Sequence, residues 1–199
     1  MTLLVVTAVD AEAAAVRAGL PADTPVTVRA VGVGPAAAAA STARLLALTP
    51  YSGVVCMGIG GGFAGRARVG DTVVATRSVA ADLGAEDGDG FIPLDVLGFG
   101  TNAHDATLPV RVSGAIEGVI LTVTTATGSA TTARVLRERH PEAVAEGMEG
   151  YGVACAAATA GIPFAEVRTI SNAIGPRDRS AWRIGDALDA LTRAAAALG

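Results

Sequence analysis

The sequence predicts an α/β fold built from βαβ units, in a single domain that spans residues 1–199. Short apolar runs alternate with alanine-rich stretches of helical length, which is typical of parallel strands joined by helices. Hydrophobic residues make up 51% of the chain and aromatic residues only 4%, a mixture that is ordinary for buried parallel strands. A chain of 199 residues can bury one sizeable core, and no internal repeat or linker divides it.

The predicted elements follow one another with short connections. The strands are apolar runs bounded by turn-forming residues, and they span residues 3–9, 26–33, 53–57, 72–79, 118–124 and 164–170. The helices are rich in small residues; one starts near Asp10, and the others span residues 35–48, 129–139, 149–160 and 186–198. Pro35 suits the first position of its helix, because no N–H partner is required there.

Three connecting segments have a distinctive composition. A glycine-rich turn is predicted over residues 58–62, and a second turn over residues 69–71. Residues 80–107 are rich in Gly and Asp and lack periodicity. A loop of this length in a compact domain usually borders an active site or an interface.

Composition and charge exclude several classes of function. The net charge of −4 gives no support for nucleic-acid binding, which normally requires a basic patch. The chain contains no lysine, which excludes Schiff-base catalysis and the lysine-containing phosphate loop. No apolar run is long enough to span a bilayer, and the first residues indicate a strand rather than a signal peptide. A cytoplasmic protein without membrane contacts is expected.

The cysteines and histidines indicate neither a disulfide nor a metal site. Cys56 and Cys155 are far apart in apolar surroundings, which favours buried free thiols. His104 and His140 are also distant in sequence, so no metal-binding cluster is indicated.

Glu12 follows the first predicted strand, at the sheet edge where ligands bind in open α/β folds. A carboxylate there can activate a water molecule as a general base. The alternative is that Asp10 and Glu12 only interact favourably with the helix N-terminus.

Two further pairs of residues reach the same edge. Met148 and Glu149 join a short strand to a helix, where the carboxylate can accept hydrogen bonds from ribose hydroxyls and Met148 can pack under the sugar. Ser171 and Asn172 end the strand at residues 164–170. The alternatives are that Glu149 only caps its helix and that Asn172 only satisfies loop backbone groups.

These landmarks resemble those of the purine nucleosidases that include methylthioadenosine/S-adenosylhomocysteine nucleosidase. They occur in that family's order and spacing over nearly the whole chain: Glu12, Val31-Gly32-Val33-Gly34, the glycines at 58–62, Val69-Gly70-Asp71, Met148-Glu149 and Ile162-Pro163-Phe164. The resemblance implies a three-layer α/β/α, nucleoside phosphorylase-like domain with a central mixed, twisted sheet. It also implies a homo-oligomer, most simply a dimer, that acts on a purine nucleoside without a cofactor.

The resemblance also implies roles for individual residues. Glu12 would activate the attacking water, and Glu149 would bind the ribose hydroxyls beside Met148. Gly60 and Gly61 would present their backbone to the base, and Thr127 would lie beside it.

Asn172 departs from the adenine-specific members, which carry Asp at this position. An amide cannot protonate the leaving base, but it donates hydrogen bonds, and a 6-oxopurine offers acceptors at N7 and O6. Adenine presents a donor at the same edge, so Asn172 favours hypoxanthine and would stabilise the charge on the departing base.

Ile59 departs from the serine that is common in the glycine-rich segment, and no arginine lies within that segment to hold phosphate, which favours hydrolysis over phosphorolysis.

The sequence around Arg177, Arg179 and Trp182 resembles that of the futalosine hydrolases of menaquinone biosynthesis. Trp182 with either arginine would bind the carboxyphenyl ketone on the 5′ side, or the arginines would form a solvated loop. A purine nucleoside phosphorylase, an adenine-type nucleosidase and a non-catalytic nucleoside-binding module are the alternatives.

Overall fold

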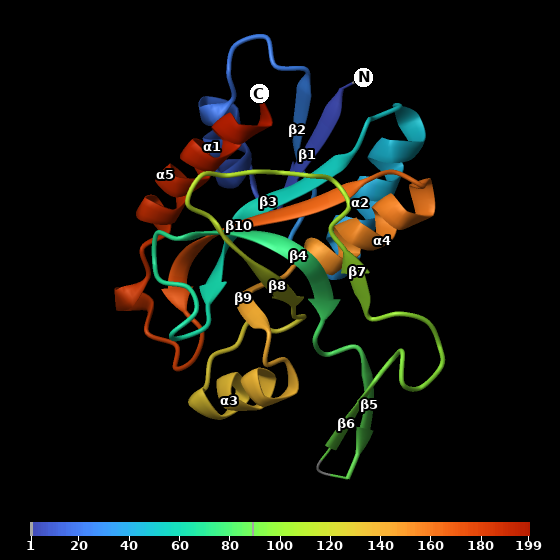
Figure 1. The fold of residues 1–199 in the computed structure, drawn as a ribbon, viewed down its shortest axis with the longest axis vertical. Helices are drawn as coiled ribbons and strands as arrows, with labels where there is room; N and C mark the ends of the chain where they lie inside the picture. The colour runs from blue at the N-terminus through green and yellow to red at the C-terminus, as the bar shows by residue number, and fades with distance from the viewer. Residues whose placement is uncertain (1, 89) are drawn as a thin grey trace.

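The computed structural model describes residues 2–88 and 90–199, in which helices flank one mixed sheet (Figure 1). The strands of this sheet are β1 (Leu3–Thr7), β2 (Val26–Ala30), β3 (Val54–Gly62), β4 (Thr72–Ala80), β7 (Ala103–Asp105), β8 (Ile116–Thr122), β9 (Ala143–Gly147) and β10 (Phe164–Ala173). A separate hairpin pairs β5 (Gly84–Asp87) with β6 (Gly90–Pro93). The predicted α/β class with a mixed sheet is confirmed.

Five strands of the sheet close into a ring. β3 pairs with β9 and β10, β10 pairs with β4, β4 with β8, and β8 with β9. β1 and β2 continue from β3 as a parallel extension. Side chains from four of the ring strands form a buried apolar cluster that includes Val73, Ala75, Ile120, Val144, Ala145 and Ile170. As a result, the carboxyl ends of β1, β9 and β10 meet the glycine-rich half of β3.

Helices cover the sheet on both faces (Figure 1). α1 (Asp10–Gly19) and α5 (Ile184–Ala195) pack together over one face, whereas α2 (Pro35–Leu48) and α4 (Gly150–Ala160) pack together over the other. α3 (Ala130–Arg139) contributes to a third cluster with β8. A Cβ at Gly152 would lie only 2.2 Å from the carbonyl oxygen of Pro35, so glycine permits the close approach of α4 to α2. None of the helices in the described residues is both long and apolar enough to cross a membrane.

The predicted turn over residues 58–62 is wrong, because these glycines continue β3. They pair with β10 along their length, and Gly61 and Gly62 also pair with β9. A Cβ at Gly60 would lie 2.6 Å from the carbonyl oxygen of Glu146, and one at Gly62 would lie 2.6 Å from that of Ala67. The glycines therefore serve close packing of neighbouring backbone rather than chain reversal.

Two other segments differ from the prediction. Residues 80–107 are not a continuous loop, since they contain β5, β6 and β7. β10 runs to Ala173, so Ser171 and Asn172 lie on the strand itself. Asn172 pairs with Gly61 of β3, and the register of this pairing shifts between Ile170 and Asn172, at the position of Ser171.

Candidate active site

A cavity of about 440 Å³ lies where the strand ends meet. It is lined by all of the predicted site residues except Arg179: Glu12, Gly60, Gly61, Thr127, Met148, Glu149, Asn172, Arg177 and Trp182. Arg179 is exposed at the start of the short helix η1 (Arg179–Ala181). A cavity of about 500 Å³ beside α3 contains none of the predicted residues, so we assign the chemistry to the first cavity.

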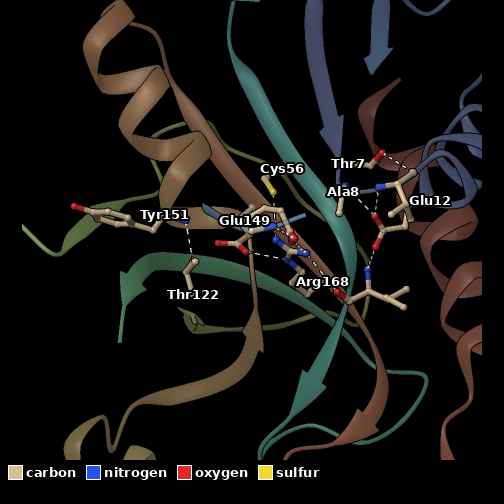
Figure 2. A network of polar contacts seen from close by, with 12 residues as sticks. Thr7, Ala8, Glu12, Cys56, Thr122, Glu149, Tyr151 and Arg168 are labelled. Carbon is tan, nitrogen blue, oxygen red and sulfur yellow. Dashed lines mark hydrogen bonds and ion pairs between the residues drawn. The ribbon is translucent and has the colours of Figure 1, made fainter. Parts of the chain in front are cut away.

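Glu12 is buried at the start of α1 and is held by three backbone donors. Its Oε2 accepts from the N–H groups of Ala8 and Val9 at 2.9 and 3.2 Å, and its Oε1 accepts from Ile59 at 2.9 Å (Figure 2). Burial raises the pKa of the Glu12 carboxyl, although Arg168 and the backbone donors oppose the shift. The side chain therefore supports its own helix terminus, as the alternative reading predicts, and also reaches β3 and the cavity.

Glu149 is the N-cap residue of α4, yet its side chain makes no capping hydrogen bond. Its Oε1 accepts from the backbone N–H of Gly34 at 3.1 Å, and its Oε2 accepts from Arg168 Nη1 at 3.0 Å. Only 3% of the surface of Glu149 is exposed. The alternative in which Glu149 only caps its helix does not describe this geometry.

Arg168 occupies the centre of the buried network, and no catalytic or binding role for it follows from the sequence reasoning above. Its Nε donates to Glu166 at 2.9 Å, and its Nη2 lies 3.3 Å from the sulfur of Cys56 (Figure 2). Ser78 donates a hydrogen bond to the other oxygen of Glu166. Charged residues inside a strand of the central sheet are the signal that marks Arg168 and Glu166, because buried arginine requires partners.

Two small residues make room for this network. A Cβ at Gly58 would lie 2.8 Å from Glu12 Oε1 and 2.9 Å from Arg168 Nη1, and a Cβ at Gly147 would lie 2.8 Å from Arg168 Cζ. Glycine at both positions thus lets one guanidinium group lie close to both Glu12 and Glu149.

Asn172 has a defined orientation. Ser171 donates its hydroxyl to Asn172 Oδ1 at 2.8 Å, and Asn172 Nδ2 donates to the carbonyl oxygen of Ala173 at 3.0 Å. Within residues 2–88 and 90–199, the second N–H of this amide has no acceptor. It is therefore a free hydrogen-bond donor on a side chain that lines the cavity.

Thr127 lines the cavity, but its polar groups are directed to a residue that the sequence reasoning missed. Its backbone N–H donates to Glu146 Oε1 at 2.9 Å, and its hydroxyl donates to Glu146 Oε2. Glu146 lies on β9 and also lines the cavity. Burial raises the pKa of the Glu146 carboxyl, and the two hydrogen bonds from Thr127 partly offset this effect.

Arg177 and Trp182 form the outer wall of the cavity. The guanidinium of Arg177 lies 5.6 Å from the centre of the Trp182 ring, within the range of a cation–π interaction. Both side chains come from the segment between β10 and α5, so this wall combines a cation with a flat apolar surface.

Comparison with known proteins identifies the family. The profile of the Phosphorylase superfamily matches residues 11–199. Futalosine hydrolase of Streptomyces coelicolor is 51% identical over 98% of this chain and 93% of that protein, and futalosine hydrolase of Acidothermus cellulolyticus is 48% identical over 98% and 89%. The native structure of futalosine hydrolase of Helicobacter pylori is 16% identical, covers 100% of this chain and 97% of that chain, and superimposes with a TM-score of 0.81. The chain belongs to the Phosphorylase superfamily and, within it, to the futalosine hydrolase family.

Proposed function

We propose that the protein hydrolyses the N-glycosidic bond of futalosine and releases hypoxanthine and dehypoxanthine futalosine in menaquinone biosynthesis. The observation that carries the proposal is one cavity that combines Glu12, Glu149 and a free amide donor on Asn172. The two relatives near 50% identity, both futalosine hydrolases, support the same substrate.

Glu149 binds the ribose and Glu12 activates water in this reaction. The oxygens of Glu149 retain lone pairs beside the contacts with Gly34 and Arg168, and these accept hydrogen bonds from the vicinal hydroxyls. Glu12 removes a proton from water, whose oxygen attacks C1′ of the sugar. A carboxylate with a raised pKa suits this role, because a base is most effective when its pKa lies near the operating pH.

The bond between C1′ and N9 breaks with its electron pair on the base. Asn172 donates a hydrogen bond to the departing hypoxanthine and stabilises the negative charge without transferring a proton. Ser171 keeps the amide in the donating orientation. Hypoxanthine then takes its proton from solvent.

The substituent on the 5′ side contacts Arg177 and Trp182. Trp182 provides a flat surface for the phenyl ring, and Arg177 pairs with the carboxylate. Arg179 is the weaker candidate for this pairing, because it does not line the cavity.

Water rather than phosphate is the nucleophile in this proposal. Ile59 uses its backbone N–H for Glu12 and contributes no hydroxyl to the cavity. Among the described residues, the one arginine that lines the cavity is Arg177, which belongs to the outer wall and does not lie near the glycines.

We further propose a cytoplasmic homo-oligomer, most simply a dimer. Val96 and Phe99 are 71% and 80% exposed in the segment between β6 and β7. An exposed aromatic residue beside a second apolar side chain favours burial against a partner. Light scattering of the native protein and of Phe99→Asp tests this, and a monomeric native protein contradicts it.

The experiment that tests the function is incubation with futalosine in phosphate-free buffer, with chromatography of the released base. Inosine, methylthioadenosine and aminofutalosine are run in parallel. Hypoxanthine release from futalosine that Glu12→Gln abolishes is the expected result. Preferential release of adenine contradicts the proposal, and activity only after addition of phosphate would identify a phosphorylase.

A further inference from the structure

Glu146 is a buried carboxylate in the cavity wall that the mechanism above leaves without a role. It lies at the carboxyl end of β9, and only 6% of its surface is exposed. Thr127 donates to both of its oxygens, once through the backbone and once through the hydroxyl. Two donors from a single residue fix the plane of the carboxylate, and each oxygen keeps one lone pair for a further donor.

Glu146 lies in register with Asn172 across a single glycine. Gly61 of β3 pairs with Glu146 of β9 on one side and with Asn172 of β10 on the other. Neighbouring strands are about 4.8 Å apart, so the two Cα atoms are separated by about 10 Å. Gly61 contributes no side chain between them, and a Cβ there would lie 2.7 Å from Ile174 Cγ1 and 3.5 Å from Asn172 Nδ2. Glu146 and Asn172, an acceptor and a donor, thus line the same cavity from the strands on either side of Gly61.

The hydrogen-bonding groups of the two side chains match a 6-oxopurine. Such a base has acceptors at N7 and O6 and a donor at N1–H. Asn172 supplies the donor for the first edge, and Glu146, when ionised, is only an acceptor. Adenine has an acceptor at N1 and a donor at N6. Its N6 donor would therefore face the donor of Asn172, and its N1 acceptor would face the acceptor of Glu146.

We propose that Glu146 accepts a hydrogen bond from N1–H of the base and, together with Asn172, selects 6-oxopurines over 6-aminopurines. The inference rests on the proposed function and concerns the same cavity. It assigns Thr127 the role of a positioning residue, which holds the Glu146 carboxylate toward the base edge. A site that leaves a buried carboxylate facing an acceptor rejects that ligand strongly.

The first test measures binding of free bases to the native protein by calorimetry, so it does not depend on turnover. Hypoxanthine is compared with 1-methylhypoxanthine, which lacks N1–H, and with adenine. Loss of a hydrogen bond to a charged group corresponds to a dissociation constant that is larger by at least about tenfold. We expect this loss for both analogues, and equal affinity for hypoxanthine and 1-methylhypoxanthine would overturn the inference.

The second test compares Glu146→Gln with the native protein on futalosine and aminofutalosine. A glutamine amide both donates and accepts hydrogen bonds. The kcat/KM for futalosine divided by that for aminofutalosine should therefore fall at least about tenfold. If Glu146 only anchors Thr127, both values decline in parallel and the ratio stays constant, which contradicts the inference. Glu142→Gln is the matched control, because it makes the same chemical change at an exposed position outside the cavity.

Thr127→Val provides a second variant if Glu146→Gln does not fold. It removes the hydroxyl donor to Glu146 and should lower the same ratio by a smaller factor, and an unchanged ratio would count against the inference. Failure of the proposed function has a different signature, since the native protein would then release no hypoxanthine from futalosine. Release with an unaltered ratio in Glu146→Gln contradicts only the role of Glu146.

Discussion

Arg168 and Glu149 form an ion pair at 3.0 Å in which both side chains are almost fully buried. The same guanidinium pairs with Glu166 at 2.9 Å. Charges withdrawn from water are tolerated when their partners compensate them, and removal of one partner leaves the others uncompensated. The pair therefore links Glu149, which lines the cavity, to the stability of the sheet.

Replacing Arg168 with methionine should lower the free energy of unfolding by about 3–5 kcal/mol, because Glu149 and Glu166 would remain buried without their cation. Urea titration followed by circular dichroism measures this loss. The control is Arg134→Gln, which breaks an exposed pair with Glu138 and should change stability by no more than about 0.5 kcal/mol. Equal effects of the two substitutions would contradict the role of the buried pair.

Glu12→Gln should reduce kcat by a factor of about 10²–10⁴, since it removes the general base. The raised pKa of Glu12 also predicts that kcat of the native enzyme rises with pH as this carboxyl ionises. A pH profile of kcat measures both effects. A variant that retains native kcat at neutral pH would exclude Glu12 as the base.

The contribution of Glu12 to stability should fall as the pH rises, whereas its contribution to kcat should increase. Because the folded-state pKa of Glu12 is raised, its contribution to stability is fully present below the unfolded-state pKa. That contribution is lost as the pH rises through the folded-state pKa. The melting temperature of Glu12→Gln minus that of the native protein should therefore increase with pH over this window. A difference that is constant or decreases with pH contradicts the prediction.

Gly150→Ala should destabilise the protein although it places a better helix former in α4. A Cβ at Gly150 would lie 2.0 Å from Glu166 Oε2, so the buried carboxylate would have to move, at a cost of about 1–3 kcal/mol. Gly185→Ala in α5 is the matched control, because its Cβ would meet nothing within 4 Å. The control should gain about 0.5–1 kcal/mol. Thermal unfolding distinguishes the opposite signs.

Arg177→Ala should raise KM for futalosine roughly tenfold or more and leave KM for inosine unchanged, because inosine lacks the carboxylate on the 5′ side. Arg179→Ala should affect neither substrate, since Arg179 lies outside the cavity. Steady-state kinetics with both substrates checks this. A parallel rise of KM for inosine would show that Arg177 acts on the nucleoside core instead.

The sequence predicts those parts of the site that lie next to strand ends. Glu12, Glu149 and Asn172 each follow a predicted strand, which places them at the carboxyl edge where ligands bind. Position alone leaves purely structural roles open for all three, and their assignment to the site comes from the resemblance to purine nucleosidases. Arg168 lies inside β10 and Glu146 near the end of β9, and the sequence of a strand gives no information about its partners in distant strands. Their pairing depends on tertiary contacts with Glu149, Glu166 and Thr127.

The same distinction explains the error at residues 58–62. Glycine is common in turns, and sequence alone does not show that a Cβ at Gly60 or Gly62 would lie 2.6 Å from the carbonyl oxygen of another segment. Local sequence patterns also cannot predict the ring of five strands, because its closure depends on which distant strands pair.

β10 closes that ring late in synthesis, because it follows the other four ring strands in the chain and pairs with both β3 and β4. Until residue 173 has emerged, the edges of those earlier strands remain open and can pair with other chains. The appearance of β10 therefore ends the period in which these ring strands are open to such pairing. Asn172, Arg168 and Glu166 arrive with that strand, so a product that ends before residue 164 lacks both the cation of the buried network and the amide that lines the cavity.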